Sequence, residues 1–178
     1  MTCGPWKAVY LESFVNRVVD VQVLVELDTG LRDAKVQVKA EVEGPGDKVM
    51  FTLTAPNGEN LALEVEVSDG LAEGNFVLKD PDLWWPIGYG AQNLYVLTTT
   101  AGNSIALKKK FGIRSAKVVQ RELADQEGST FFFEVNGTPI WVGGSNWIPA
   151  DNFLTRMDES GYRRWLNLVR DGNQIMVR

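Results

Sequence analysis

The stretch Val19-Asp-Val-Gln-Val-Leu-Val-Glu-Leu27 decides the fold of the first half of this chain. Valine or leucine occupies every odd-numbered position, and most of the positions between them are charged or polar. Alternation with a period of two predicts a β-strand, here with one fully apolar face from Val19 to Leu27. The same pattern recurs at Lys35–Val42 and predicts a second strand, with Val36, Val38, Ala40 and Val42 on the apolar face.

Turn signals divide the next residues into further strands. Pro56-Asn57-Gly58-Glu59 predicts a hairpin turn, and Gly102-Asn103 predicts another. The further strands that we expect are Val49–Thr54, Leu61–Val67, Phe76–Leu78, Leu94–Thr100 and Ser104–Phe111. Seven short strands at regular spacing are typical of an immunoglobulin-like β-sandwich.

The carboxyl-terminal third has a different pattern. Asn136-Gly137 predicts a tight turn, and the apolar run Ile140–Val142 predicts the next strand. Asp171-Gly172 marks a helix end, and Ile175–Val177 predicts another buried strand. Between them lies a helical stripe made of Tyr162, Trp165, Leu166 and Val169, with Thr155 or Asp158 as its expected cap. Strand, helix and strand in this order predict the first βα unit of a truncated (β/α)₈ barrel, so we expect a piece of a longer protein.

Composition excludes several classes of function. The formal net charge is −5, and the one basic run, Lys108-Lys109-Lys110, is interpreted as the solvated end of a strand. We therefore expect no nucleic-acid or membrane partner. The sequence has one cysteine, Cys3, and no histidine. This excludes an internal disulfide, cysteine clusters and histidine-based metal or nucleophile systems, and no cofactor or metal is expected. Carboxylates remain for chemistry, as in glycoside hydrolysis. A single cysteine is compatible with an intracellular or a secreted protein.

The polar loop Gly143–Asp151 follows the first predicted barrel strand. In α/β barrels the carboxyl ends of the strands carry the active site. Asn146, Trp147 and Asp151 are residue types that bind sugars, because an indole covers the apolar face of a pyranose while an amide and a carboxylate bond its hydroxyls. We take these three as candidate substrate-binding residues and assign no catalytic residue. In the structural alternative, Trp147 packs against a neighbouring loop and Asp151 caps a short turn.

Two other segments have alternative interpretations. The loop Asp80–Gly90 contains Trp84, Trp85 and Tyr89. In one interpretation these aromatics form a carbohydrate-binding platform. In the interpretation that we favour, Trp84 and Trp85 fill an interface between the sandwich and the next domain. Asn136-Gly137-Thr138 is formally an N-glycosylation sequon, but the backbone of a tight hairpin demands Asn-Gly by itself, so we favour a turn.

Five segments together resemble family 2 glycoside hydrolases, and most closely the β-mannosidases. They are Gly4-Pro-Trp-Lys-Ala-Val-Tyr-Leu-Glu12, Asp80-Pro-Asp-Leu-Trp-Trp-Pro-Ile-Gly-Tyr-Gly-Ala-Gln-Asn-Leu-Tyr95, Lys110-Phe-Gly-Ile-Arg114, Phe133-Glu-Val-Asn-Gly-Thr-Pro-Ile-Trp-Val-Gly-Gly-Ser-Asn-Trp-Ile-Pro-Ala-Asp151 and Asp171-Gly-Asn-Gln-Ile-Met-Val-Arg178. The resemblance spans essentially the whole chain.

The resemblance implies a domain organisation and an activity. Residues 1–14 would be the last strand of a preceding jelly-roll domain, residues 15–121 the immunoglobulin-like sandwich, and residues 122–178 the incomplete start of the catalytic barrel, with a polar linker at 121–129. The parent would be a retaining exo-β-mannosidase that hydrolyses terminal non-reducing β-D-mannose from oligosaccharides. Its two catalytic glutamates would lie on later barrel strands, so this stretch would be inactive alone. The alternative is a non-catalytic immunoglobulin-like module that binds carbohydrate or protein.

Overall fold

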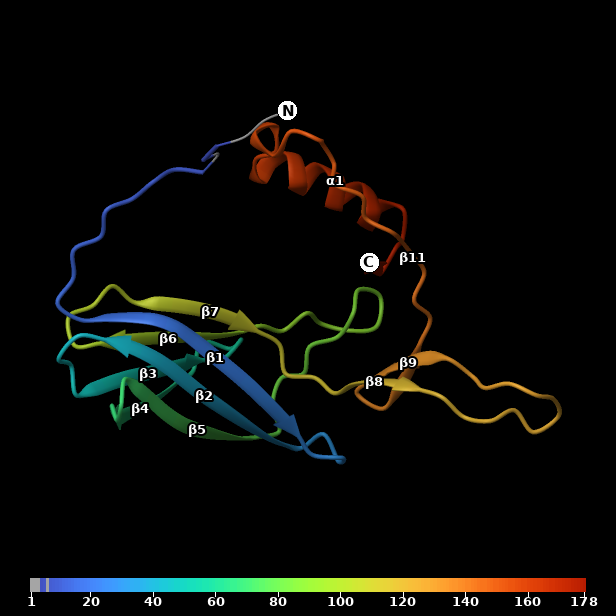
Figure 1. The fold of residues 1–178 in the computed structure, drawn as a ribbon. Coiled ribbons are helices and arrows are strands. Elements are labelled where there is room, and N and C mark those ends of the chain that lie inside the picture. The colour runs from blue at the N-terminus through green and yellow to red at the C-terminus, as the bar shows by residue number, and fades with distance from the viewer. Residues whose placement is uncertain (1–3, 6) are drawn as a thin grey trace. The chain divides into compact units, whose positions relative to one another are not determined.

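The computed structural model describes residues 4–5 and 7–178, so Cys3 and Trp6 lie outside the described residues. The described chain is mainly β, as predicted, and it forms two compact units (Figure 1). The sandwich unit comprises residues 12–116 and 135–137. The carboxyl-terminal unit comprises residues 117–134 and 138–178, together with the residues before Glu12.

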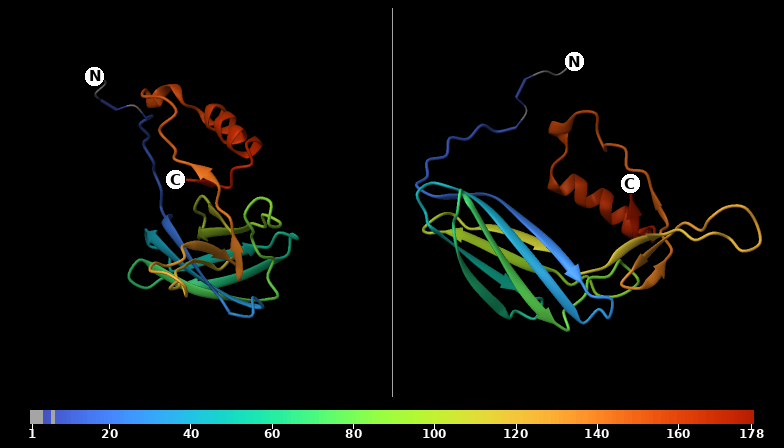
Figure 2. Two further views of the ribbon diagram at one scale, coloured as in Figure 1. Left: turned by 90° about the vertical axis from the view of Figure 1, so that its right-hand side faces the viewer. Right: turned by 60° about the horizontal axis from the view of Figure 1, so that its bottom comes forward.

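The sandwich unit contains the seven predicted strands. They are β1 (Arg17–Leu27), β2 (Asp33–Glu43), β3 (Lys48–Thr54), β4 (Asn60–Glu66), β5 (Leu71–Lys79), β6 (Tyr95–Ala101) and β7 (Leu107–Phe111). They pair antiparallel in two open sheets, β1-β2-β5 and β4-β3-β6-β7, which Figure 2 shows from two further sides. In constant-type immunoglobulin domains the fourth strand lies in the same sheet as the first two. Here β4 lies beside β3 instead.

One hydrophobic core joins the two sheets face to face. Val36, Val38 and Ala40 of β2 are buried, and so are Phe51 of β3 and Leu97 of β6. All belong to a single cluster that draws on both sheets. The alternation predicted for β2 is therefore confirmed, and the removal of these apolar faces from water is the main source of stability.

The prediction for the start of β1 was wrong by one residue. Val18 is buried, whereas Val19 is 42% exposed. The pairing of β1 with β2 shifts register between Val18 and Asp20, so a β-bulge at Val19 reverses the faces of the strand. A bulge places two residues opposite one, which moves every side chain before it to the other face.

Both predicted hairpin turns of the sandwich are confirmed. β3 and β4 pair up to Thr54 and Asn60, and the main-chain N–H of Ala55 donates to the main-chain oxygen of Glu59 at 2.8 Å. β6 and β7 pair around Gly102-Asn103 and end at Phe111. The two turn sequences therefore make β3 the neighbour of β4 and β6 the neighbour of β7 in the four-stranded sheet.

A third sheet, with strand order β10-β9-β8, follows the sandwich strands. It consists of β8 (Ala116–Val119), β9 (Phe132–Val135) and β10 (Thr138–Ile140). The predicted linker at 121–129 is a closed loop. The N–H of Thr130 donates to the main-chain oxygen of Arg121 at 2.8 Å, and Glu122 forms an isolated antiparallel β-bridge with Ser129. These bonds join the ends of the charged stretch instead of leaving it extended.

The carboxyl-terminal unit also contains a parallel strand–helix–strand element. β11 (Gly144–Ser145) pairs parallel with β12 (Met176–Val177), and α1 (Glu159–Asp171) connects them. The predicted strand Ile140–Val142 was wrong, because β10 ends at Ile140 and the parallel strand begins at Gly144. A glycine is required there, since a Cβ at Gly144 would meet the main-chain oxygen of Met176.

Residues 7–12 form no strand in the structure, and no strand of the described residues pairs with them. A strand needs a neighbour for its main-chain groups, and the lone strand expected at Trp6–Glu12 is not formed over its described part, residues 7–12. Within the described part of the chain, no helix combines the length and the apolarity required to cross a membrane.

Candidate functional site

A groove of about 470 Å³ lies in the carboxyl-terminal unit, between the loop after β11 and one side of α1. Its size falls within the range of small-molecule sites. The loop supplies Asn146 and Trp147, and the helix supplies Trp165, Leu168 and Val169. Polar atoms from Ser145 and Gln174 lie at the same groove, so it offers both an aromatic surface and hydrogen-bonding groups.

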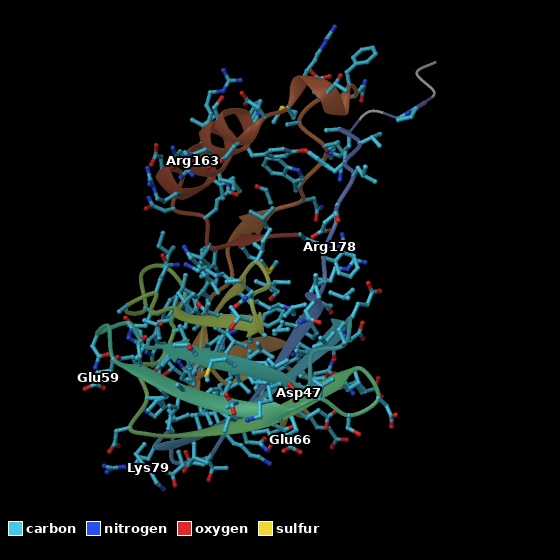
Figure 3. All side chains as sticks on the ribbon, turned by 90° about the vertical axis from the view of Figure 1, so that its left-hand side faces the viewer. Asp47, Glu59, Glu66, Lys79, Arg163 and Arg178 are labelled. Carbon is cyan, nitrogen blue, oxygen red and sulfur yellow. The ribbon has the colours of Figure 1, made fainter. Side chains whose placement is uncertain are left out.

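Main-chain pairing with the segment after α1 holds Asn146 and Trp147 in place. The N–H of Trp147 donates to the main-chain oxygen of Arg178 at 2.7 Å, which extends the pairing of β11 with β12. Oδ1 of Asn146 accepts a hydrogen bond from the Arg178 guanidinium at 3.3 Å. Asn146 is exposed and the Trp147 side chain is half-buried, so both remain available to a ligand. Figure 3 labels Arg178 at the end of this segment.

A second pair fixes the polar side of the groove. The hydroxyl of Ser145 donates to Oε1 of Gln174 at 2.7 Å. This bond joins the residue at the end of β11 to the residue shortly before β12. It leaves the amide group of Gln174 with hydrogen-bonding capacity for a ligand.

Asp151, the third candidate, does not line the groove. Its Oδ1 accepts a hydrogen bond from the N–H of Phe153 at 2.7 Å, and Oδ2 lies 4.0 Å from the Arg156 guanidinium. Asp151 thus caps the short turn that leads into the 3₁₀ helix η1 (Leu154–Arg156). The structure brings Asn146 and Trp147 together and leaves Asp151 in the capping position.

Sequence reasoning did not select Trp165 as a site residue. It lies on the apolar stripe of α1, which was predicted to be the buried face of the helix. The structure leaves every residue of α1 short of burial, and Trp165 is 39% exposed. Two features of the sequence could have identified Trp165: its side chain is aromatic, and its helix follows the loop that contains the candidate sugar-binding residues Asn146 and Trp147.

The start of α1 is set by Asp158, one of the two expected caps. Its Oδ1 accepts hydrogen bonds from the N–H of Gly161 at 2.8 Å and from the hydroxyl of Ser160 at 2.7 Å. These two hydrogen bonds stabilise the charged form of the Asp158 carboxyl and so hold its pKa below the ordinary value. The bond from Gly161 has the larger effect and the bond from Ser160 the next. Gly172 ends the helix, as predicted.

The aromatic loop of the sandwich unit packs on its own domain. The Trp84 side chain lies against Gly112, where an added Cβ would come within 2.6 Å of it, and the Arg114 guanidinium lies 4.5 Å from the centre of the Trp84 ring. Trp85 packs in the same way on Gly90. The interactions shown here hold both indoles within the sandwich, and an interface with another domain stays a prediction.

The formal sequon at Asn136 is a turn. Asn136 and Gly137 have φ values of 49° and 74°, the left-handed pair of a tight hairpin turn. Asn136 is only 4% exposed, and both ends of its amide are hydrogen-bonded. The interpretation as a turn is therefore confirmed.

Carboxylates near the groove are engaged in local structure. Glu159 pairs with Arg163 at 2.6 Å, and Asp151 and Asp158 cap main-chain N–H groups. Arg163 is labelled on α1 in Figure 3. Within residues 4–5 and 7–178, no three potential ligands among histidine, cysteine, aspartate and glutamate come together as a metal site would require.

The fold therefore combines an antiparallel β-sandwich with a short parallel α/β element that carries an aromatic and polar groove. The family model of the glycosyl hydrolases family 2 matches residues 16–114, which is the sandwich. The chain belongs to this family.

Curated relatives match beyond the sandwich. The chain is 41% identical to beta-mannosidase B of Thermothelomyces thermophilus and 42% identical to beta-mannosidase B of Aspergillus clavatus. Each match covers 100% of this chain and 22% of the relative. The chain thus spans about a fifth of the length of the curated relatives that it matches.

Solved structures agree with the fold. The crystal structure of the beta-D-mannosidase from Dictyoglomus thermophilum matches with a TM-score of 0.75 and 29% identity, over 92% of this chain and 21% of that one. A beta-glucuronidase from Parabacteroides merdae matches with a TM-score of 0.73, over 92% of this chain and 21% of that one. Its identity is 17%, so it supports the fold alone.

Proposed function

We propose that this chain is part of a retaining exo-β-mannosidase that hydrolyses terminal non-reducing β-D-mannose from oligosaccharides. The observation that carries the proposal is the match of the entire chain to beta-mannosidases B at about 40% identity. In this proposal residues 1–14 end a preceding domain, residues 15–121 form a structural sandwich and residues 122–178 open the catalytic barrel.

The parallel element supports the assignment of a barrel start. β11, α1 and β12 have the order of a βα barrel unit, in which the loop after the first strand lies at the catalytic end. The uncovered apolar stripe of α1 also fits this assignment, because such a helix face packs on a sheet. The parent enzyme would therefore bring further strands to this face.

We assign Asn146, Trp147 and Asp151 to substrate binding in the parent enzyme. The groove that contains Asn146 and Trp147 supports their part of the assignment. Asp151 would act from its cap, since its carboxylate has free lone pairs beyond the bond to Phe153. No role in catalysis is assigned to any residue of this stretch.

The residues 1–178 alone are expected to be inactive. Retaining glycosidases need two carboxyl groups about 5–5.5 Å apart around the sugar. The carboxylates nearest the groove are occupied with capping or ion pairing. Purified 178-residue protein should therefore give no turnover of a chromogenic β-mannoside, and measurable turnover would contradict the proposal.

Binding can be tested separately from turnover. The indole N–H signals of the protein are followed by NMR during titration with mannobiose. A saturable shift that is lost in Trp147→Ala and kept in Trp85→Ala supports the groove. A shift lost only in Trp85→Ala supports the alternative, a non-catalytic carbohydrate-binding module.

A further inference from the structure

The three lysines of β7 do not share one environment. The ammonium of Lys109 donates a hydrogen bond to the main-chain oxygen of Val21 on β1. Lys108 and Lys110 extend from the opposite face of the strand and are exposed. Among the described residues neither has an ion pair or a hydrogen bond. Two unpaired positive charges therefore lie at the β7 edge, on the outer face of the four-stranded sheet.

The centre of this outer face carries no charge. The outward residues of the two central strands are Met50, Thr52, Thr54, Val96, Thr98 and Thr100. Register places Thr52 directly opposite Thr98. Apart from Met50, which is 36% exposed, these side chains are half-buried.

The other sheet of the same sandwich provides an internal comparison. Its central strand, β2, directs Lys35, Lys39 and Glu41 outward, as expected for a face in contact with water. A charge-free centre bordered by charged edges is instead typical of a protein interface. The two outer faces of the sandwich thus differ in the feature that distinguishes interfaces from ordinary surface.

The edge opposite β7 is acidic. Glu64 and Glu66 on β4 and Asp47 before β3 surround Lys48. Lys48 lies 2.6 Å from Glu64, and this hydrogen bond together with the charges of Asp47 and Glu66 raises the pKa of Lys48. Three carboxylates around one ammonium leave a surplus of two negative charges. Figure 3 labels Asp47 and Glu66.

We infer that the outer face of the four-stranded sheet is the interface of a two-fold symmetric dimer of this chain. A two-fold axis that lies in the interface and runs along the strands places β7 of each copy over β4 of the other. Lys108 of each copy then lies over the row of Ala62, one row from Glu64 of the other copy, while Lys110 lies over Asn60 and adds positive charge to the same edge. An axis across the strands would place like charges together, so the charge pattern selects the first arrangement.

The register makes one such pair reachable, Lys108 with Glu64 of the other copy. Lys108 lies in one row with Thr98, Thr52 and Ala62, and the adjacent row contains Glu64. Adjacent rows on one face are two residues apart, about 7 Å at the rise of a β-strand. A lysine side chain spans most of that distance, so Lys108 reaches Glu64 of the second copy along a diagonal.

The dimer is expected to be weak and sensitive to salt. The centre holds threonines and one methionine instead of the aromatic and arginine anchors that dominate tight interfaces. A micromolar dissociation constant fits such a surface, and added salt weakens it because the edge pairs are open to solvent.

Sedimentation equilibrium of the full 178-residue chain, from micromolar to millimolar concentration, tests the inference. Wild type should populate dimers. Lys108→Glu with Lys110→Glu makes both edges acidic, and Glu64→Lys with Glu66→Lys makes both edges basic. Each double variant alone should raise the dimer dissociation constant at least about tenfold. An equimolar mixture of the two variants should form a heterodimer again.

Lys35→Glu with Lys39→Glu is the matched control, because it makes the same change of charge on the outer face of the other sheet. It should leave the dissociation constant unchanged, and circular dichroism checks that every variant is folded. A monomeric wild type overturns the inference and leaves the face to another segment or partner. A dimer that survives both charge reversals, or that the control weakens equally, overturns it as well.

Discussion

The side-chain amide of Asn136 donates a hydrogen bond to the main-chain oxygen of Trp84 at 3.0 Å. The other end of the same amide accepts a hydrogen bond from the N–H of Ser115 at 2.9 Å. The Asn136 main-chain N–H donates to the oxygen of Ser115, also at 2.9 Å. One buried side chain therefore ties the β9–β10 turn to the aromatic loop and to the segment after β7.

Asn136→Asp tests this tie. Aspartate keeps the size and tolerates the left-handed backbone, but as a carboxylate it has no proton to donate to Trp84 and it is buried. We expect the free energy of unfolding to fall by about 2–3 kcal/mol, measured by urea denaturation. Asn57→Asp, at the exposed Asn-Gly turn between β3 and β4, is the control and should change it by less than about 0.5 kcal/mol. Equal effects of the two substitutions would disprove the role of the buried amide.

Thr99, unlike Asn136, is a buried polar residue whose side chain is not hydrogen-bonded among the described residues. It lies on β6 at 0% exposure, and its hydroxyl has no hydrogen-bond partner among the residues that the structure describes. Thr99→Val replaces the hydroxyl by a methyl group of similar shape, which removes the cost of a buried unpaired polar group. The protein should become more stable by about 1 kcal/mol, seen as a higher urea midpoint at an unchanged slope. Thr98→Val on the outer face is the control, and a loss of stability in Thr99→Val would show that the hydroxyl is bonded in solution.

The sandwich could be predicted because its signals are local. The alternation in β2 is complete, since that strand has a partner on each side and one face on the core. The bulge at Val19 could not be predicted, because it depends on the pairing of β1 with β2 and leaves no mark in a run of valines. β11 was missed for a related reason. Its two residues, Gly144 and Ser145, show no period, and only the pairing with β12 makes them a strand.

The candidate site was predicted in part. Asn146 and Trp147, which line the groove, could be selected as candidates because their position after a strand and their chemistry are both visible in the sequence. Asp151 has the same chemistry, but its carboxylate caps a short turn. A single sequence does not distinguish an aspartate that caps a turn from one that binds a sugar. Trp165 lies far away along the chain and joins the groove only through the crossover helix.

Lys109 closes the open edge between the two sheets. Its ammonium bonds the main-chain oxygen of Val21, which joins the edge strands β7 and β1. Lys109→Met keeps most of the apolar stem and removes the donor, so the partly buried oxygen of Val21 loses a partner. Stability should fall by about 1–2 kcal/mol in urea denaturation. Lys35→Met, on the exposed outer face of β2, should have little effect, and a similar loss in both variants would argue against the bond.

The cap at Asp158 makes the stability of α1 depend on pH. Its carboxyl has a pKa below the ordinary value, because Gly161 and Ser160 bond the charged form. The cap is therefore fully effective above the pKa of an unfolded aspartate, about 3.9, and is lost as the pH falls through the lower pKa of the folded state. NMR titration tests this dependence. The titration midpoint of the Asp158 carboxyl-carbon signal should lie below that of an unstructured aspartate.

The amide signals of the first turn of α1 should shift with the same midpoint. In Asp158→Asn the side-chain oxygen still accepts the bond, so the first turn should show no such transition. A midpoint of Asp158 at or above the unstructured value would mean that the cap is absent in solution.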